Sequence, residues 1–515
     1  MRKNLNPVRN SKVEKNMEQN LLEVSSKFQP GQKRKISNGV NRRDFFKAAG
    51  LTAASLALPG CATASQNVTG GRPPNFIIIY CDDLGYGDIG CFGSTKHRTP
   101  NLDQMADEGM RFTSFYVTSG VCTPSRSSLM TGCYPRRVNM HANDTGLCVL
   151  IPVNKKGLNP NEITVADMLK EQRYATACIG KWHLGDQLKF LPTRQGFDYY
   201  FGIPYSNDMG KGPNNNRPPL PLLRNEKVIE APANQDTITK RYTEEAVKFI
   251  TANKDRPFFI YLPHTMPHNP VHAGEKFRGK SANGRYGDTV EEIDWSTGEI
   301  LSALKKFGID NRTLVIFTSD NGASNRFGGG NGPLRGHKGS TWEGGMREPC
   351  IVRWPRKIPA GKTCDEVATT MDLLPTFAKI AGTRPPTDRI IDGRNIWPLM
   401  AGKKNAKSPH QAFYYYQIDQ LQAVRSGKWK LHLPLEAKKR NWGKPIPNSP
   451  LQLYNLDADI GEKNDVADEN PDVVNRLLGF AEKARDDLGD LNRKGRNQRP
   501  AGWVENPKPL LFEPV

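Results

Sequence analysis

Short aliphatic runs alternate with amphipathic stretches from residue 72 onward. A continuous apolar run of about four to eight residues is typical of a strand buried on both faces, whereas apolar positions three or four apart predict a helix. The runs that indicate strands are 76–80, 174–179, 258–262, 314–317 and 350–354. Helices are expected after Thr164, around 242–250 and over 290–307. This alternation predicts an α/β fold with a mostly parallel sheet sandwiched by helices.

The pattern changes near residue 405. Two apolar segments, 413–416 and 423–433, indicate strands, and the second segment can turn as a hairpin at Ser426-Gly427. A last helix is expected from Pro471 onward, with Asn470 as its cap. The chain therefore divides into a larger domain over 72–404 and a small C-terminal subdomain over 405–515, with an antiparallel sheet plus a helix.

The first 64 residues are predicted to direct export. Residues 1–40 are basic and expected to be disordered, while 41–64 resemble a twin-arginine export signal, with Arg42-Arg43 before an apolar stretch. Cleavage at a lipoprotein box would leave a lipid anchor at Cys61, and cleavage after Ala64 would leave none. We therefore expect an exported protein of a bacterium, either periplasmic or a membrane-anchored lipoprotein, whose partners include the twin-arginine export machinery.

Composition narrows the function classes. The chain has 515 residues, 73 Lys or Arg and 53 Asp or Glu, which gives a formal net charge of +20. Twelve of the basic residues and four of the acidic ones lie within the first 47 positions, so the remainder has a mildly basic surface. No zinc-finger spacing or basic-aromatic motif is present, and we expect no nucleic-acid partner. The positive surface is either simply solvated or attracts an anionic substrate.

The nine cysteines have no regular spacing, and no disulfide framework is predicted. No apolar run reaches the length of a membrane-spanning helix. These two observations leave a large core as the expected source of stability.

Acidic and amide side chains follow two of the predicted strands. Asp82 and Asp83 come after the strand 76–80, and Asp320 and Asn321 come after 314–317. Because ligands bind outside the carboxyl ends of parallel strands, these side chains are expected at one rim. Either pair alone could be a turn or a helix cap. Together they indicate an oxygen-only site for calcium or magnesium, because clustered carboxylates repel one another unless a cation neutralises them.

A second candidate is Cys122-Thr-Pro-Ser-Arg126. Pro124 suits a first helical turn, so Cys122 is expected at a helix N-terminus, where free amides favour an anion. Arg126 adds a positive fork one turn later. Such a cysteine could also be inert, or a thiolate nucleophile of the phosphatase kind.

These motifs together resemble the formylglycine-dependent type I sulfatases. The matching segments are Cys122–Arg126 with Leu129, Thr131 and Gly132, then 180–185 (GKWHLG), 319–322 (SDNG) and 336–345 (GHKGSTWEGG). Residues 203–208 (IPYSND) further resemble the branch of arylsulfatase A and N-acetylgalactosamine-6-sulfatase. The resemblance covers roughly 72–490 and implies an alkaline-phosphatase-like fold. Cys133 departs from it, since many relatives carry Arg there.

The resemblance implies that a separate maturase (a formylglycine-generating enzyme or its equivalent) oxidises Cys122 to formylglycine on the unfolded chain. It assigns one calcium, with magnesium as the alternative, to five ligands: Asp82, Asp83, Asp320, Asn321 and modified Cys122. The hydrated aldehyde would be the nucleophile. Arg126, Lys181 and Lys338 would stabilise the sulfuryl oxygens. His268, assisted by Lys338, would protonate the leaving alcohol, and His183 would accept a proton.

The expected function is therefore hydrolysis of sulfate esters on sulfated polysaccharides or their oligosaccharides. Two rivals remain at this point. One is a phosphomonoesterase or phosphodiesterase of the same superfamily, since phosphate and sulfate esters share tetrahedral geometry. The other is a non-catalytic protein that binds sulfated glycans.

Overall fold

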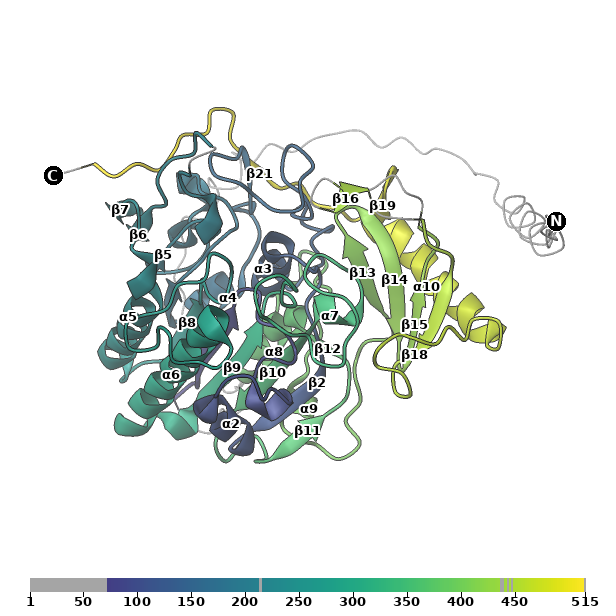
Figure 1. Cartoon of the computed structure of the whole chain (residues 1–515), viewed down its shortest axis with the longest axis horizontal. Coiled ribbons are helices and arrows are strands. Elements are labelled where there is room, and N and C mark those ends of the chain that lie inside the picture. Colours follow the sequence, from purple (N-terminus) through teal and green to yellow (C-terminus); the bar gives the residue numbers. More distant parts are fainter. Residues whose placement is uncertain (1–71, 213–214, 436–439, 442–443, 446–447, 514–515) are drawn as a thin grey trace, which may run out of the picture. The chain divides into compact units, whose positions relative to one another are not determined.

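The computed structural model describes residues 72–212, 215–435, 440–441, 444–445 and 448–513. The basic stretch 1–40 and the export signal expected over 41–64, with Cys61, lie outside these residues. The described residues belong to one compact unit that holds a large mixed sheet and a smaller antiparallel one (Figure 1). Among them, no helix is long and apolar enough to cross a bilayer, and no disulfide bond joins the cysteines.

The large sheet is built around five parallel strands in the order β9, β1, β8, β4, β5. Their bounds are Asn75–Cys81 (β1), Ala175–Ile179 (β4), Tyr199–Gly202 (β5), Phe258–Pro263 (β8) and Thr313–Ser319 (β9). Antiparallel strands extend both edges. The antiparallel strands are Met110–Tyr116 (β2), Leu222–Arg224 (β6), Lys227–Glu230 (β7) and Arg347–Arg353 (β10). Two short strands, Lys362–Cys364 (β11) and Ala368–Thr369 (β12), pair with β2. The predicted mostly parallel sheet is thus confirmed.

Alternate residues of the central strand β1 serve two separate cores. Phe76 and Ile78 face one hydrophobic cluster, while Ile77 and Ile79 face the other, and all four are fully buried. The helices over the first cluster are Cys122–Thr131 (α3), Val165–Glu171 (α4), Leu373–Ile380 (α8) and Trp397–Met400 (α9). Those over the second are Pro100–Asp107 (α2), Ile238–Asn253 (α5) and Gly284–Lys306 (α6). Burial on both faces explains why the strand sequences are continuously apolar.

The predicted helices are confirmed, with bounds set by local chemistry. Thr164 caps α4 through a reciprocal capping box with Asp167, which satisfies two backbone amides at the helix start. The sequence patterns did not identify β2, β5 or α2. The strand β5 is only four residues long, and its aromatic sequence lacks a clear period.

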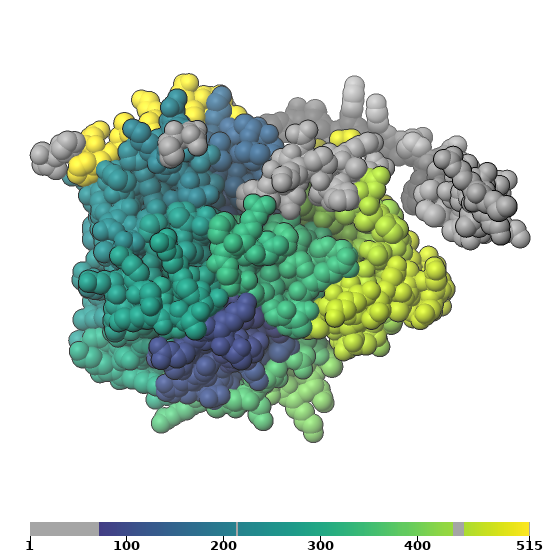
Figure 2. Space-filling model, in the orientation of Figure 1, coloured from purple at the N-terminus to yellow at the C-terminus, as the bar shows by residue number. Residues whose placement is uncertain are grey.

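The smaller sheet consists of Phe413–Gln417 (β13), Gln420–Ser426 (β14), Trp429–His432 (β15) and Gln452–Asn455 (β18), all antiparallel. The helix Pro471–Leu488 (α10) packs against this sheet, as Figure 1 shows. In Figure 2 these yellow-green elements lie against the green residues of the larger part. The predicted antiparallel sheet plus helix is confirmed. The chain end returns to the larger part, where Gly502–Trp503 (β21) pairs with Lys156–Gly157 (β3).

A buried ion network joins the two sheets. Glu343 begins the short helix Glu343–Met346 (α7), and its carboxylate accepts from Lys430 of β15 at 3.0 Å and from the Tyr415 hydroxyl of β13 at 2.9 Å. Lys430 also contacts Glu462 at 2.8 Å, and all three charged side chains are fully buried. Burial alone would raise the pKa of Glu343, but Lys430 and two arginines lower it, so the carboxylate stays ionised.

We expect Lys430→Met to lower the free energy of unfolding by about 3–5 kcal/mol, because it leaves two buried carboxylates without their shared cation. Urea denaturation of purified protein measures this change. The matched control is Lys407→Met: Lys407 is 80% exposed and its ion pair with Glu366 lies at the surface. That control should leave the free energy of unfolding close to the wild-type value, because an exposed ion pair contributes little to stability. Equal costs for the two variants would contradict the interpretation.

Candidate metal and anion site

The carboxyl ends of β1 and β9 bring four polar side chains together. The two strands pair in parallel with Cys81 beside Ser319, so the residues that follow them are neighbours. The backbone amide of Asp83 donates to Asp320 Oδ1 at 3.2 Å, and Asn321 Nδ2 donates to Asp83 Oδ1 at 2.8 Å. The predicted acidic rim therefore exists. Asp83 adopts a left-handed backbone conformation (φ 65°), which re-aims the chain directly after Asp82.

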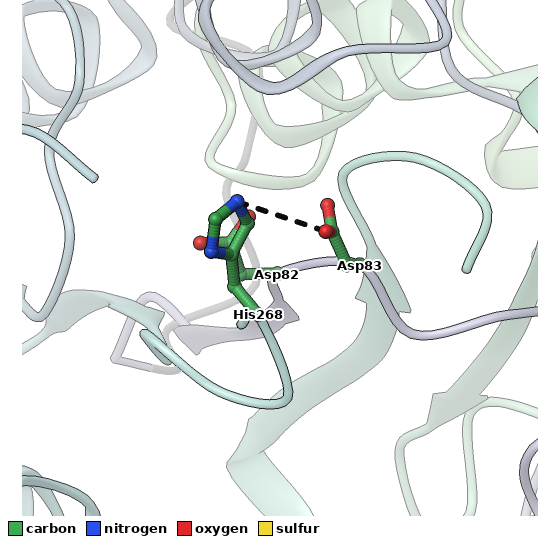
Figure 3. A group of neighbouring side chains, drawn as sticks. All are labelled: Asp82, Asp83 and His268. Carbon is green, nitrogen blue, oxygen red and sulfur yellow. Dashed lines mark ion pairs between the residues drawn. The ribbon is translucent and has the colours of Figure 1, made fainter. Parts of the chain in front are cut away.

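Cys122 lies at the same rim as the first residue of α3. One ligand atom each from Asp82, Cys122 and Asp320 lie within 4.8 Å of one another, and the same holds for Asp82, Asp83 and His268. Figure 3 shows His268 pointing toward Asp83, with Asp82 behind the ring. Burial raises the pKa of the Cys122 thiol to about 11, although Lys181 and Lys338 oppose this rise.

Each carboxylate of the rim has its own cationic partner. Lys181, which follows β4, contacts Asp82 at 2.6 Å, and Lys338 contacts Asp83 at 2.7 Å. Arg126 donates from Nε to Asp320 at 2.9 Å. All three predicted basic residues thus lie at the site. Because these side chains are at most 9% exposed, the attraction within each pair is stronger than between the same charges in water.

The pKa values of two rim carboxyls diverge. Burial opposes ionisation of Asp82, but Lys181, His268 and Arg126 outweigh it and lower its pKa. Burial raises the pKa of Asp320 to about 7 despite Arg126, since Asp82 adds like-charge repulsion. A bound cation would favour the ionised form of both groups.

The guanidinium group of Arg126 contacts the rim carboxylates and does not face solvent. Its side chain is fully buried, with Nη2 2.7 Å from Asp320 and 3.5 Å from Asp82. Its Nη1 donates to the Lys181 carbonyl oxygen at 3.1 Å. Arg126 therefore fixes the positions of the rim carboxylates and of the loop that carries Lys181.

Two oxygens that accept no hydrogen bond make this rim suitable for a cation. Asp82 Oδ1 and Asn321 Oδ1 are buried and accept no hydrogen bond. A buried acceptor without a donor is costly, and a cation would satisfy both atoms. The oxygen-rich set of Asp82, Asp83, Asp320 and Asn321 matches the preference of a hard divalent ion.

His268 and His183, the two histidines predicted to act at the site, have different hydrogen-bond partners. His268 Nδ1 lies 2.9 Å from Asn207 Oδ1, while Nε2 lies 3.5 Å from the Ser206 hydroxyl and 3.7 Å from Asp83. Burial and the nearby Lys338 lower its pKa. His183 pairs through Nε2 with the Leu150 carbonyl oxygen at 2.9 Å, and its buried Nδ1 has no hydrogen-bond partner. Burial and Lys181 hold its pKa well below the usual range.

Ser206 and Asn207 are functional-site residues whose roles the sequence patterns did not predict. They follow the unpredicted strand β5, and Lys181 Nζ donates to Ser206 Oγ at 3.2 Å. The pattern of short apolar runs could not identify the end of β5, because this strand has no such run. Only the likeness of the segment 203–208 to a known motif marked it.

A pocket of about 630 Å³ opens beside this segment. Asn207 and Pro270, two of its lining residues, also hold the loop that carries His268. Its apolar lining comes from prolines with Leu220 and Ala233, and its polar lining includes Asp208, Lys211, Asn215 and Gln235. Apolar surface with a few polar groups is typical of a small-molecule site.

Comparisons with known proteins place this geometry in context. A family model described as Sulfatase matches residues 74–383, and one described as N-sulphoglucosamine sulphohydrolase, C-terminal, matches 337–474. Human arylsulfatase A is 38% identical over 447 residues (79% of this chain and 86% of the relative). The dog N-acetylgalactosamine-6-sulfatase is 41% identical, covering 74% of each chain.

Two solved structures resemble this chain in fold and in sequence. The crystal structure of Ps i-CgsB in complex with k-i-k-neocarrahexaose matches with a TM-score of 0.69 and 32% identity, covering 80% of this chain and 92% of that one. The PsFucS1 sulfatase from Pseudoalteromonas sp. matches with a TM-score of 0.72 and 29% identity, covering 80% and 90%. The expected alkaline-phosphatase-like fold is confirmed by these likenesses.

His264, the residue directly after β8, is a buried neighbour of this rim. Its ring is fully buried and lies 3.4 Å from the Ser296 hydroxyl. Burial lowers its pKa to about 3, so the ring is neutral in the folded state near neutral pH. This histidine is a structural neighbour of the site rather than part of the rim contacts.

We expect His264 to make folding stability depend on pH between about 6.5 and 3. The unfolded chain binds a proton there that the folded chain excludes, so stability falls as pH falls. At pH 5 the contribution is about 2 kcal/mol less than at pH 7. Denaturation of the wild type and of His264→Gln at both pH values measures it, with the pH 7 difference taken as the packing cost. An identical pH dependence in the two proteins would contradict the assignment.

Proposed function

The chain belongs to the sulfatase family and is a sulfuric ester hydrolase, and we propose that it releases sulfate from sulfated polysaccharides or their oligosaccharides. The observation that carries this proposal is the convergence of Cys122, the rim carboxylates and the cations Arg126, Lys181 and Lys338 at one end of the parallel sheet. A tetrahedral anion needs such cations around it, and ester cleavage needs a nucleophile among them.

We propose that Cys122 works as formylglycine. The thiol itself is a poor candidate nucleophile, because its pKa of about 11 leaves little thiolate at neutral pH. Cys122-x-Pro-x-Arg126 provides the recognition core for a separate maturase. Since Cys122 is only 2% exposed, that maturase would act before the chain folds.

Asp82, Asp83, Asp320 and Asn321, with modified Cys122, would hold one calcium ion, with magnesium as the alternative. The support is the pair of unpartnered buried oxygens together with the oxygen donor set. Together the ion and the hydrated aldehyde would supply an acidified hydroxyl and Lewis-acid polarisation of the sulfate.

The protein side chains divide the remaining tasks. Lys181 and Lys338 would hold the sulfuryl oxygens, with Arg126 acting through the carboxylates it fixes. His268 would give a proton to the leaving oxygen, assisted by Lys338. His183, kept neutral by burial and with an unpartnered Nδ1, suits the role of proton acceptor at residue 122.

The leaving group is proposed to be carbohydrate. The 630 Å³ pocket beside His268 combines apolar lining with amide groups, which suits the apolar faces and hydroxyls of a sugar ring. Among the similar proteins, one is named N-acetylgalactosamine-6-sulfatase and one was solved with k-i-k-neocarrahexaose. Outside the first 47 residues the formal net charge is +12 (61 Lys or Arg and 49 Asp or Glu), which favours association with a polyanion.

We also propose that the protein is exported. The segment 41–64 would use twin-arginine machinery, and cleavage at its lipoprotein box would anchor the protein through Cys61. A bacterial enzyme placed in the periplasm or on a membrane would meet polysaccharide fragments there.

We expect Cys122→Ala to lower sulfate release at least about a thousandfold, because it removes the nucleophile. The assay scores sulfate released from a panel of oligosaccharides with defined sulfate positions, with a phosphate monoester as comparator. Cys133→Ala, another buried cysteine near the same helix, should keep activity. Mass spectrometry of the wild-type peptide should show a loss of about 18 Da at Cys122. Unchanged turnover by Cys122→Ala would contradict the proposal.

Calcium should stabilise the chelator-treated protein, by about 2.7 kcal/mol at a hundred times its dissociation constant. We expect Asn321→Ala to need roughly tenfold more calcium for the same shift in melting temperature, because it removes one oxygen ligand. Thermal melts across a calcium titration measure this. Asn159→Ala removes an amide that donates to the Pro500 carbonyl oxygen outside the site, and this variant should titrate like the wild type. An unchanged titration in Asn321→Ala would count against the ligand set.

A further inference from the structure

The amide of Asn207 is fully committed to hydrogen bonds. Its Nδ2 donates to the Pro270 carbonyl oxygen at 3.0 Å and to Gln235 Oε1 at 2.9 Å. Its Oδ1 faces His268 Nδ1 at 2.9 Å. The side chain is 3% exposed, so water does not compete effectively for these groups. Every hydrogen-bonding atom of the amide therefore has a partner in the protein.

The Pro270 contact settles which way the amide points. A backbone carbonyl can only accept, so the atom facing Pro270 must be the nitrogen of the Asn207 amide. The oxygen is then the atom that faces His268, and an oxygen there can only accept from the ring. His268 must therefore keep its proton on Nδ1, which leaves Nε2 for the side of the ring toward Ser206 and Asp83.

Gln235 holds this arrangement from the outside. Its Oε1 accepts from Asn207 Nδ2. Its Nε2 donates to the backbone carbonyl oxygen of Asn207 at 3.4 Å. Gln235 is half-buried and, like Asn207, lines the 630 Å³ pocket. Both residues therefore line the pocket, and Asn207 also contacts the His268 ring.

We propose that Asn207, braced by Gln235, is a positioning residue that fixes the tautomer and ring orientation of His268 for proton delivery to the leaving oxygen. This inference rests on the proposed function. A ring free to flip would present the wrong nitrogen, or a nitrogen without its proton, for part of the time.

The proton balance follows from this tautomer. Before the reaction, Nε2 takes up a second proton from solvent, and the ring is then charged. A nucleophilic oxygen would bond to sulfur as the bond between sulfur and the ester oxygen breaks. The electron pair of the broken bond goes to the leaving oxygen, which takes the proton from Nε2. The ring is then neutral with its proton on Nδ1, the form that Asn207 accepts from. No rotation of the ring is needed at any point, and the amide stabilises both the starting and the final ring.

The test compares two esters that differ in their need for a proton. A sugar alcohol is a poor leaving group and needs protonation, whereas 4-nitrophenolate leaves without it. The carbohydrate ester is whichever member of the oligosaccharide panel the wild type hydrolyses fastest. We expect Asn207→Ala to lower kcat about 10- to 100-fold for the carbohydrate ester and less than about threefold for 4-nitrophenyl sulfate.

Gln235→Ala should shift the same ratio in the same direction by a smaller factor, and it tests the arrangement without touching the amide that contacts His268. The control for general loss of stability is Asn101→Ala. It removes an amide bonded to the buried carboxylate of Asp294 at 2.7 Å, away from the rim. This control should leave the ratio between the two esters unchanged.

The outcomes separate cleanly. A selective loss on the carbohydrate ester in both site variants supports the positioning role. An equal loss on both esters, in variants that melt as cooperatively as the wild type, overturns this inference while leaving the proposed function intact. Absence of turnover of either ester by the wild type would overturn the proposed function and this inference with it.

Discussion

Mutual neutralisation of buried charge is the constraint on which the site depends. Asp82 has a carboxylate oxygen within 4.8 Å of one from Asp83 and one within 4.8 Å of Asp320, and all three side chains are buried, so they would repel one another if left alone. Lys181, Lys338 and Arg126 each offset one of them. The same cations that make the carboxylates tolerable also create the positive field that an anionic ester requires. Scaffold and function therefore share one set of interactions.

The parallel sheet makes this concentration possible. Because β9, β1, β8 and β4 run in the same direction in neighbouring positions, their ends deliver residues that lie far apart in the sequence to one rim. The cores on the two faces hold the strands in register. A shift of β1 by one residue would exchange the clusters that its side chains face and would displace Asp82 along the strand, so the apolar packing of β1 also fixes the position of the chemistry at its end.

Much of the parallel sheet and of its acidic rim could be predicted from the sequence, because both are marked by short local patterns. Continuous apolar runs marked four of the five parallel strands, and the Asp82-Asp83 and Asp320-Asn321 pairs stand directly after two of them. The partners of His268 could not be predicted that way, since they depend on β5, a short strand without a period, and on tertiary contacts with Gln235. The full burial of Arg126 was equally hidden, because sequence spacing gives no depth.

The loop that carries Lys338 has a second attachment whose consequence reaches beyond stability. Five residues after Lys338, Glu343 is bound by Lys430 from the smaller sheet, and its backbone amide donates to Glu462 at 2.8 Å. The smaller sheet is therefore part of the support for the anion-binding rim. A shortened gene that ended before residue 405 would encode no minimal enzyme, and recombination that exchanged this segment between relatives would have to carry compatible counter-charges with it.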